Sequence, residues 1–396
     1  MHLLTGARRS YDWGSTTSMP EFLGTDPDGK PFAELWLGAH PTGPSTIIGP
    51  TGNEGLDEWV ARDRLGNLGQ RVDAAFGRLP YLVKLLAPAK PLSIQVHPTR
   101  GLAAKGFLEE ERQGIPLDAP HRTFKDMNNK PEMVYAISNF DGLAGFRPRQ
   151  EIARLLEELA GPLEPARARL STTPGEHGMR LMLEILVGLP PEDIQTVLEI
   201  AASLALLHPH PVVRAACATV RELANAYPGD VGAVVSLVLN RVHLAPGESM
   251  FLADGVPHAY LGGFGLEVMA NSDNVLRLGL TSKHIDVEAM LGAVDFSSSG
   301  FDVTSAPKDA ATHTFRPPVP DFALSIAHPG KTDEGRTTLP GDGPRILVCL
   351  DGNVTVETRS SADTCALTKG QSLFVAAAEG SIRVEGPGTI AQAFVP

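Results

Sequence analysis

Alternation of apolar and polar residues runs through most of the chain and predicts many short β-strands. The stretch from Pro91 to Pro98 alternates with period 2, so its apolar and polar side chains point to opposite faces. The apolar face carries Leu92, Ile94 and Val96, and the polar face carries Ser93, Gln95 and His97. Comparable stretches are 33–40, 81–86, 132–137, 237–244, 249–253, 258–261, 266–270, 275–280, 345–350, 353–358, 372–375, 382–384 and 389–394. Short strands separated by Gly and Pro turns indicate β-sandwiches or barrels of the jelly-roll kind.

A different periodicity fills the middle of the chain. Between about Arg149 and Tyr227 the apolar residues recur every three or four positions, which predicts amphipathic helices. One stripe is Ile152, Leu155, Leu156 and Leu159, and another is Val213, Ala216, Val220, Ala224 and Tyr227. Residues 56–68 predict one further, modest helix. We therefore expect a mainly β protein interrupted by an all-helical insertion.

A weak internal repeat indicates two related β domains. Leu244-Ala-Pro-Gly-Glu-Ser-Met-Phe-Leu-Ala253 resembles Leu367-Thr-Lys-Gly-Gln-Ser-Leu-Phe-Val-Ala376. The first copy continues to a histidine, His258, whereas the second continues to Ala377-Ala-Glu-Gly380 without one. We expect a split domain at 1–148 and 234–310, a helical insertion at 149–233, and a C-terminal jelly-roll domain at 311–396 without metal ligands.

Composition and charge restrict the class of protein. The 396 residues are 42% hydrophobic and 20% charged, which is typical of a folded, water-soluble chain. No apolar run is long enough to cross a membrane, and the N-terminus lacks the apolar core of a signal peptide. A net charge of -12 without a basic stripe argues against nucleic acid as a partner. The three cysteines, Cys217, Cys349 and Cys365, are widely spaced, so we expect reduced thiols and a cytoplasmic protein.

Four polar side chains form a candidate metal site. Gln95 and His97 share one strand face, Glu132 begins a later strand, and His258 follows a Gly-x-Pro turn. A proline-flanked histidine after a Pro-Gly turn and a strand is typical of cupin barrels. An amide oxygen, two imidazoles and a carboxylate suit Zn²⁺, although Fe²⁺, Mn²⁺ and Co²⁺ remain alternatives. Taken alone, Gln95 and His97 would more often be surface or core residues than ligands.

Six motifs, in this order along the chain, identify a family. They are Tyr11-Asp-Trp-Gly-Ser15, Glu34-Leu-Trp-Leu-Gly-Ala-His-Pro-Thr-Gly-Pro44, Leu92-Ser-Ile-Gln-Val-His-Pro98, Lys130-Pro-Glu-Met133, Pro257-His-Ala-Tyr260 and Asn271-Ser-Asp-Asn-Val-Leu-Arg-Leu-Gly-Leu-Thr-Ser-Lys283. Together they make the chain similar to the type I phosphomannose isomerases of the cupin superfamily. One position departs from the family pattern, since Asn129 stands where a histidine is common. The helical segment and the C-terminal part match only in outline.

The resemblance implies a zinc-dependent isomerase of mannose 6-phosphate and fructose 6-phosphate. It implies one Zn²⁺ per chain, held by the positions Gln95, His97, Glu132 and His258, and a cis-enediol intermediate. It also places Arg277 in the active site, where its permanent charge suits an enediolate. The sequence leaves the oligomeric state open, a monomer included.

Other residues are candidates for the remaining roles. We expect Lys130 and Glu267 to take part in catalysis, and Ser93, Lys84 and Tyr260 to bind substrate. Glu267 is our candidate acid/base, with a metal-bound water or Asp273 as alternatives. Lys84 and Ser93 could instead be structural, because a strand lysine often extends its ammonium to solvent at an edge.

Two further readings compete with the isomerase. The chain could be a catalytically silent sugar-binding cupin, or a cupin metalloenzyme that acts on another substrate. His208-Pro-His210 has an attractive spacing but lies beside prolines in the helical segment, so we expect a loop. His40 is expected to bind backbone, and the helical segment could cover the cavity without any pattern that requires a lid.

Overall fold

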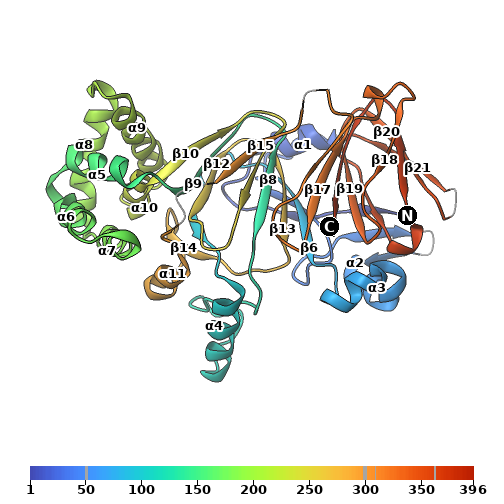
Figure 1. The fold of residues 1–396 in the computed structure, drawn as a ribbon, viewed down its shortest axis with the longest axis horizontal. Coiled ribbons are helices and arrows are strands. Elements are labelled where there is room, and N and C mark those ends of the chain that lie inside the picture. The colour runs from blue at the N-terminus through green and yellow to red at the C-terminus, as the bar shows by residue number, and fades with distance from the viewer. Residues whose placement is uncertain (50–51, 298–300, 308, 361–362) are drawn as a thin grey trace.

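The structure is a computed structural model, and it describes residues 1–49, 52–297, 301–307, 309–360 and 363–396. The helices of residues 149–235 gather at one end of the molecule, two β-sheets lie in the middle, and the C-terminal sheets lie at the other end (Figure 1). Within the described residues, no helix is both long enough and apolar enough to span a bilayer.

Two sheets form the central part of the molecule, and all their neighbouring strands pair antiparallel. The seven-stranded sheet has the order β15(Asp302–Ser305), β11(Glu248–Leu252), β8(Glu132–Ala136), β13(Gly265–Ala270), β6(Tyr81–Leu86), β3(Glu34–Leu37), β2(Ala7–Arg9). The five-stranded sheet has the order β10(Leu239–Leu244), β9(Phe140–Phe146), β12(His258–Gly262), β7(Ile94–Val96), β14(Leu276–Gly279). The predicted strands of this region are therefore present, and β2, β9 and β15 are additional ones.

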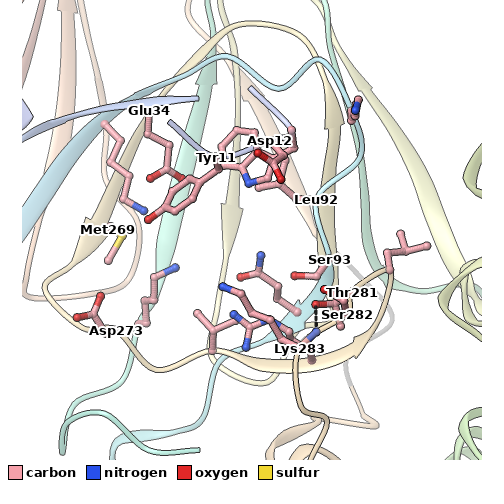
Figure 2. A pocket seen from close by; sticks show the side chains of 18 of the residues that line it. Tyr11, Asp12, Glu34, Leu92, Ser93, Met269, Asp273, Thr281, Ser282 and Lys283 are labelled. Atoms are coloured by element: carbon pink, nitrogen blue, oxygen red, sulfur yellow. Dashed lines mark hydrogen bonds between the residues drawn. The ribbon is translucent and has the colours of Figure 1, made fainter. Parts of the chain in front are cut away.

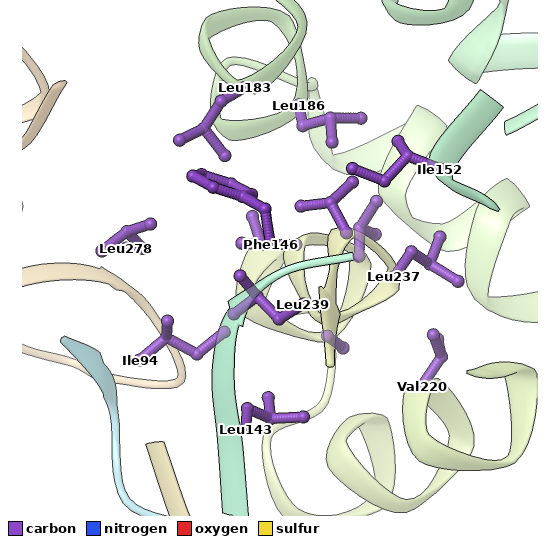
Figure 3. Packing of buried hydrophobic residues seen from close by; sticks show 14 of the residues in the cluster. Ile94, Leu143, Phe146, Ile152, Leu183, Leu186, Val220, Leu237, Leu239 and Leu278 are labelled. Carbon is purple, nitrogen blue, oxygen red and sulfur yellow. The ribbon is translucent and has the colours of Figure 1, made fainter. Parts of the chain in front are cut away.

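Helices cover the outer face of the five-stranded sheet. They are α5(Arg149–Leu159), α6(Glu164–Thr172), α7(Gly175–Val187), α8(Pro191–Leu207), α9(Pro211–Ala226) and α10(Val231–Val235), with the 3₁₀ turns η1(Gly161–Leu163) and η2(Ser236–Val238). Figure 3 shows Ile152 and Leu183 of the helices in one buried cluster with Ile94, Leu143 and Leu278 of the sheet. Burying each such side chain contributes roughly 1.5–3 kcal/mol. The helices predicted between about 149 and 227 are thus present, and they pack against one face of β7.

The C-terminal strands form a second pair of sheets. The eight-stranded sheet has the order β16(Thr312–Phe315), β17(Ala323–Ala327), β24(Thr389–Phe394), β19(Arg345–Asp351), β22(Ser372–Val375), β1(His2–Thr5), β4(Thr46–Gly49), β5(Gly52–Gly55). The four-stranded sheet has the order β18(Arg336–Leu339), β23(Ile382–Glu385), β20(Asn353–Thr358), β21(Thr364–Thr368). The short 3₁₀ turns η3(Pro329–Lys331) and η4(Ala377–Glu379) connect strands of this region.

Strand pairing departs from the predicted division of the chain. Strands β1, β4 and β5 come from the first 55 residues, which we had assigned to the central domain. In the structure, Leu3 of β1 pairs with Leu373 of β22, and β4 pairs with β1. Such pairing joins the two ends of the chain, and no local periodicity encodes it.

The remaining helices lie outside the sheets. They are α1(Ser18–Leu23), α2(Leu56–Arg62), α3(Arg64–Phe76), α4(Arg100–Arg112) and α11(Val287–Ala293). The single helix predicted at 56–68 is two helices, since Asp63 interrupts it and accepts a hydrogen bond from the Gly66 N–H at the start of α3. Helix α4 projects from the central sheets (Figure 1).

Candidate metal centre and its cavity

Three metal-ligating side chains converge between the two central sheets. His97 follows β7, His258 begins β12, and Glu132 begins β8 of the opposite sheet. The Nε2 atoms of His97 and His258 lie 3.2 Å and 3.0 Å from the two carboxylate oxygens of Glu132. All three side chains are at most 2% exposed. Among the described residues, this is the one group of three or more His, Cys, Asp or Glu side chains close enough to share an ion.

Backbone carbonyls orient both imidazoles. Nδ1 of His97 lies 2.7 Å from the carbonyl oxygen of Asn274, and Nδ1 of His258 lies 2.9 Å from that of Val256. A neutral imidazole has one N–H donor and one acceptor nitrogen, so each Nδ1 carries the proton and each Nε2 lone pair points toward Glu132. This second contact is typical of histidines that bind metals. Two nitrogen lone pairs and a carboxylate directed at one point fit a borderline cation such as Zn²⁺.

Burial and charge keep His97 and Glu132 in the protonation states that a metal requires. Burial, together with the neighbouring ammonium of Lys130, lowers the pKa of His97 to about 3. Burial alone would raise the pKa of Glu132, but the ammonium of Lys130 and the contacts with His258 and His97 hold it well below its usual range. At neutral pH His97 is therefore a neutral imidazole and Glu132 a carboxylate.

Two predicted functional residues contact the carboxylate of Glu132. Nζ of Lys130 lies 2.6 Å from its Oε2 and 3.2 Å from Nε2 of His97. The Tyr260 hydroxyl donates to its Oε1 at 2.9 Å. Lys130 and Tyr260 also line a small inner cavity of about 50 Å³ beside the three ligands. Gln95 lines the same cavity and pairs directly with His258 across the strands.

A larger cavity of about 690 Å³ opens outside the inner one. Gln95, Lys130 and Lys84 line both cavities, so a ligand in the larger one reaches the metal centre. Ser93 and Lys283 lie on one side of it and Glu34 on the other (Figure 2). The alternation predicted for residues 91–98 holds from Ile94 onward. Leu92 departs from it, because it lines both cavities together with the polar residues.

Lys84 and Glu267 form a buried ion pair at the inner cavity. They are directly opposite on β6 and β13, and Nζ lies 2.9 Å from Oε2. Lys84 is 7% exposed, so the alternative of an ammonium extended to solvent is wrong. Burial and the charge of Glu132 raise the pKa of Glu267, and the ammonium of Lys84 opposes that rise. Burial alone would lower the pKa of Lys84, but the carboxylates of Glu267, Glu34 and Glu132 raise it above its usual value.

Cations without carboxylate partners line one wall of the larger cavity. Arg277 pairs with Gln95 on the neighbouring strand, and burial lowers the pKa of its guanidinium. In the described part of the chain, neither Arg277 nor Lys283 has a side-chain hydrogen bond or an ion pair. Ser93 lies on the same wall. A half-buried guanidinium without a counter-ion favours an anionic ligand.

A network of hydrogen bonds around Asp126 joins two loops beside the site. The Asp126 carboxylate accepts from the Asn128 N–H at 2.8 Å, from the Ser272 hydroxyl at 3.0 Å and from the Asp273 N–H at 2.9 Å. Asn274 is fully buried and donates to the carbonyl oxygens of Asp126 and Asn128, both at 2.8 Å. Because the carbonyl oxygen of Asn274 accepts a hydrogen bond from His97, the network connects both loops to a candidate metal ligand.

Asn129 and the other histidines lie away from the metal centre. Asn129 donates from Nδ2 to Asp254 at 2.8 Å and lines neither cavity described above. His40 accepts from the Thr42 N–H, which confirms its predicted backbone contact, and its Nε2 lies 3.4 Å from Asp273. His208-Pro-His210 is the connection between α8 and α9, as predicted.

Sequence reasoning missed the roles of Glu34 and Lys283. Glu34 is 7% exposed, accepts from Trp36 Nε1 at 2.6 Å and lines both cavities. Both residues stand at the ends of motifs quoted above, and a charged residue within a short apolar strand was the available signal for Glu34. Lys283 follows β14 by four residues, so no strand periodicity placed it.

Comparisons with known proteins identify the family. A model of the phosphomannose isomerase type I catalytic domain matches residues 1–149. The chain is 38% identical over 399 residues to mannose-6-phosphate isomerase of Escherichia coli, covering 100% of this chain and 99% of the relative. It is 33% identical over 418 residues to the Homo sapiens mannose-6-phosphate isomerase, covering 97% and 95%.

Solved structures give the same assignment. The crystal structure of mannose 6-phosphate isomerase from Salmonella typhimurium, bound to the substrate fructose 6-phosphate and zinc, matches with a TM-score of 0.89 and 36% identity. The match covers 100% of this chain and 99% of that one. A zinc-bound mannose 6-phosphate isomerase matches with a TM-score of 0.90 and 35% identity, again over 100% and 99%. The chain therefore belongs to the mannose-6-phosphate isomerase family, whose catalytic domains are of the type I phosphomannose isomerase kind.

Proposed function

We propose that this chain is a zinc-dependent isomerase that interconverts mannose 6-phosphate and fructose 6-phosphate. The observation that carries the proposal is the convergence of His97, Glu132 and His258 beside an inner cavity. That inner cavity shares Gln95, Lys84 and Lys130 with the larger cavity, whose lining includes the cations Arg277 and Lys283. Full-length relatives carry the name of this activity, and one of them binds fructose 6-phosphate and zinc.

We infer that the central sheets are a cupin-type jelly roll built from 1–148 and 234–310. Residues 149–233 form the inserted helical domain, and residues 311–396 form a second jelly roll, to which β1, β4 and β5 contribute. The cytoplasm is our proposed location, since the three cysteines are free thiols in the structure.

Gln95, His97, Glu132 and His258 would hold one Zn²⁺ per chain. Gln95 is added to the three converging ligands because its strand neighbour is His258 and it lines the inner cavity. A Zn²⁺ ion held by these residues would supply Lewis-acid polarisation of substrate oxygens, which would stabilise negative charge that develops on them. Lys130 and Tyr260 position the carboxylate of Glu132 and present their polar atoms to the same inner cavity.

The reaction moves a proton from C2 to C1, and a hydroxyl hydrogen from O2 to O1, through a cis-enediol. Arg277, Lys283 and Ser93 offer donors to the phosphate on one wall of the larger cavity, which positions the sugar with C1 and C2 toward the inner cavity. Lys84 and Lys130 place two further positive charges beside the inner cavity, where they stabilise the developing enediolate.

Glu267 is the proposed acid/base. Its carboxylate is 2% exposed, lines the inner cavity and has a raised pKa, which brings its proton affinity closer to that required at neutral pH. Asp273 is the alternative, because it lines the larger cavity. Replacing Glu267 by Gln should lower kcat by at least about 10²-fold, while near-normal turnover would assign the proton transfer to Asp273 or another group.

One assay tests the proposed function. Fructose 6-phosphate formation from mannose 6-phosphate is followed with purified protein, after chelation, and after zinc is restored. We expect turnover, its loss and its recovery. Sugar phosphate binding without turnover in the zinc-loaded protein would support the silent sugar-binding alternative instead.

A further inference from the structure

A side pocket of about 440 Å³ adjoins the cationic wall of the larger cavity. It lies between the loop that follows α4 and the segment that joins β14 to α11. Arg277, Ser282 and Lys283 line both the side pocket and the larger cavity, whereas Lys125 and His284 line only the side pocket. The two cavities therefore share a cationic partition.

The charges of the side pocket are unevenly neutralised. Its lining carries Arg122, Lys125, Arg277 and Lys283 against Asp118 and Asp286. Arg122 is paired with Glu110 and Glu111 at 3.0 Å and 2.8 Å. Asp286 is occupied as well, because it caps α11 through the Ala289 N–H and accepts from the Thr123 hydroxyl.

Three cations keep free donors in this pocket. Nζ of Lys125 donates to one acceptor, the carbonyl oxygen of Leu117 at 2.7 Å. Arg277 and Lys283 have no side-chain hydrogen bond or ion pair among the described residues. Burial and the neighbouring charges of Arg277 and Lys125 lower the pKa of Lys283, as expected for an ammonium subject to repulsion by like charges. An anion between them would relieve that repulsion.

We propose that the side pocket binds a second phosphoryl group, as part of a short phosphoanhydride or a bisphosphorylated sugar. The single phosphate of the substrate contacts Arg277 and Lys283 from the larger cavity, and Lys125 lies beyond them in the side pocket. A ligand with two linked phosphoryl groups can use the partition and Lys125 together. Resting on the proposed function, such a ligand inhibits isomerisation because it takes Arg277 and Lys283 from the substrate phosphate.

Pyrophosphate and orthophosphate are the two probes. Both should inhibit the zinc-loaded enzyme, but only pyrophosphate should depend on Lys125. Replacing Lys125 by Met should raise the inhibition constant of pyrophosphate about 10-fold or more, since a charge-assisted hydrogen bond is lost. The inhibition constant of orthophosphate, and kcat and KM for mannose 6-phosphate, should stay within about twofold of wild type, because Lys125 does not line the larger cavity.

Matched variants separate the pocket from general effects of charge. Lys125→Arg should retain pyrophosphate inhibition, and Lys105→Met removes an exposed α4 charge outside the pocket and should change nothing. His284→Glu brings a repelling charge from the other side of the pocket and should weaken pyrophosphate as Lys125→Met does. It gives a second test if the loop does not tolerate methionine.

Equal pyrophosphate inhibition of wild type and both pocket variants would overturn the proposal, and so would no inhibition of wild type. Pyrophosphate that inhibits by removing zinc would inhibit wild type and both pocket variants equally, because chelation does not depend on Lys125. Zinc content is therefore measured after each incubation. Calorimetric titration of the zinc-loaded protein with pyrophosphate reports on the pocket independently. An enzyme without isomerase activity that still binds pyrophosphate through Lys125 would refute the proposed function and leave the pocket standing.

Discussion

The central and the C-terminal pair of β-sheets each contain a similar turn, but different kinds of side chain fill the space between their sheets. The turn before β11 and the turn before β22 each contain a glycine with positive φ, Gly247 at 93° and Gly370 at 86°, followed two residues later by a buried serine. The repeat seen in the sequence thus corresponds to one backbone conformation used twice. Only glycine adopts such φ values without strain.

The interiors of the two pairs are filled differently. Between the C-terminal sheets lie apolar side chains, among them Leu347, Val356, Leu367 and Ile390. Between the central sheets, an apolar cluster fills one part, and His97, Glu132, Lys84 and other charged groups fill the rest. An interior closed by aliphatic groups is a structural core, whereas buried charges that contact one another around a cavity have a cost that only function explains.

The largest expected effect comes from removing a ligand in the central pair. His258→Ala should abolish zinc binding and lower kcat/KM by about 10³-fold or more, since a Lewis acid contributes several kcal/mol to the barrier. Zinc content by mass spectrometry and the coupled isomerase assay measure both.

A truncation in the C-terminal pair is the matched control. Leu367→Ala leaves a cavity and should cost roughly 2–5 kcal/mol of unfolding free energy while zinc content stays at one per chain. Loss of zinc from this variant would mean that the two interiors are not independent.

Removing the buried ammonium should affect the pH profile. Lys84 lowers the pKa of Glu267, so Lys84→Met raises that pKa further and moves the acidic limb of kcat/KM to higher pH. We expect about a 10²-fold loss at pH 7. Lys90→Met, which changes a lysine of the larger cavity only, is the control. An unshifted acidic limb would show that Glu267 does not titrate in that limb.

Weakening the hydrogen-bond network around Asp126 should have a smaller effect on turnover. Asp126→Asn removes a charged acceptor from several hydrogen bonds, and we expect about a 10-fold lower kcat with zinc retained. Asp342→Asn, on a side chain that is 88% exposed, should stay near wild type. An unchanged kcat in Asp126→Asn would show that the loops hold their positions without this carboxylate.

Much of this contrast follows from local patterns, and the rest depends on long-range contacts. Period 2 placed Gln95 on the cavity face and Ile94 on the helical face, because alternation is a property of the strand itself. The pairing of β1 with β22 and the contact of Lys84 with Glu267 join distant segments, so no local pattern contained them. Lys130 was predicted as a catalytic residue, yet its contact with Glu132 became visible only with both sheets in place.

The smallest expected effect concerns stability. Burial raises the pKa of Asp254 to about 6, above its unfolded value of 3.8. Its contribution to stability is therefore fully present below pH 3.8 and is lost as the pH rises through 6. Asp254→Asn should gain about 0.5 kcal/mol of unfolding free energy at pH 8 and nothing at pH 4. Urea denaturation at both pH values measures this, and a gain of the same size at pH 4 would assign it to a cause other than ionisation.

Anomalous diffraction at the zinc edge, on crystals of the zinc-loaded protein, tests the difference between the two interiors most directly. The predicted result is one peak per chain, within bonding distance of Nε2 of His97 and His258 and of the Glu132 carboxylate, with the Gln95 amide oxygen as fourth ligand. A peak between the C-terminal sheets, or no peak between the central ones, would contradict the assignment of the metal centre to the central pair.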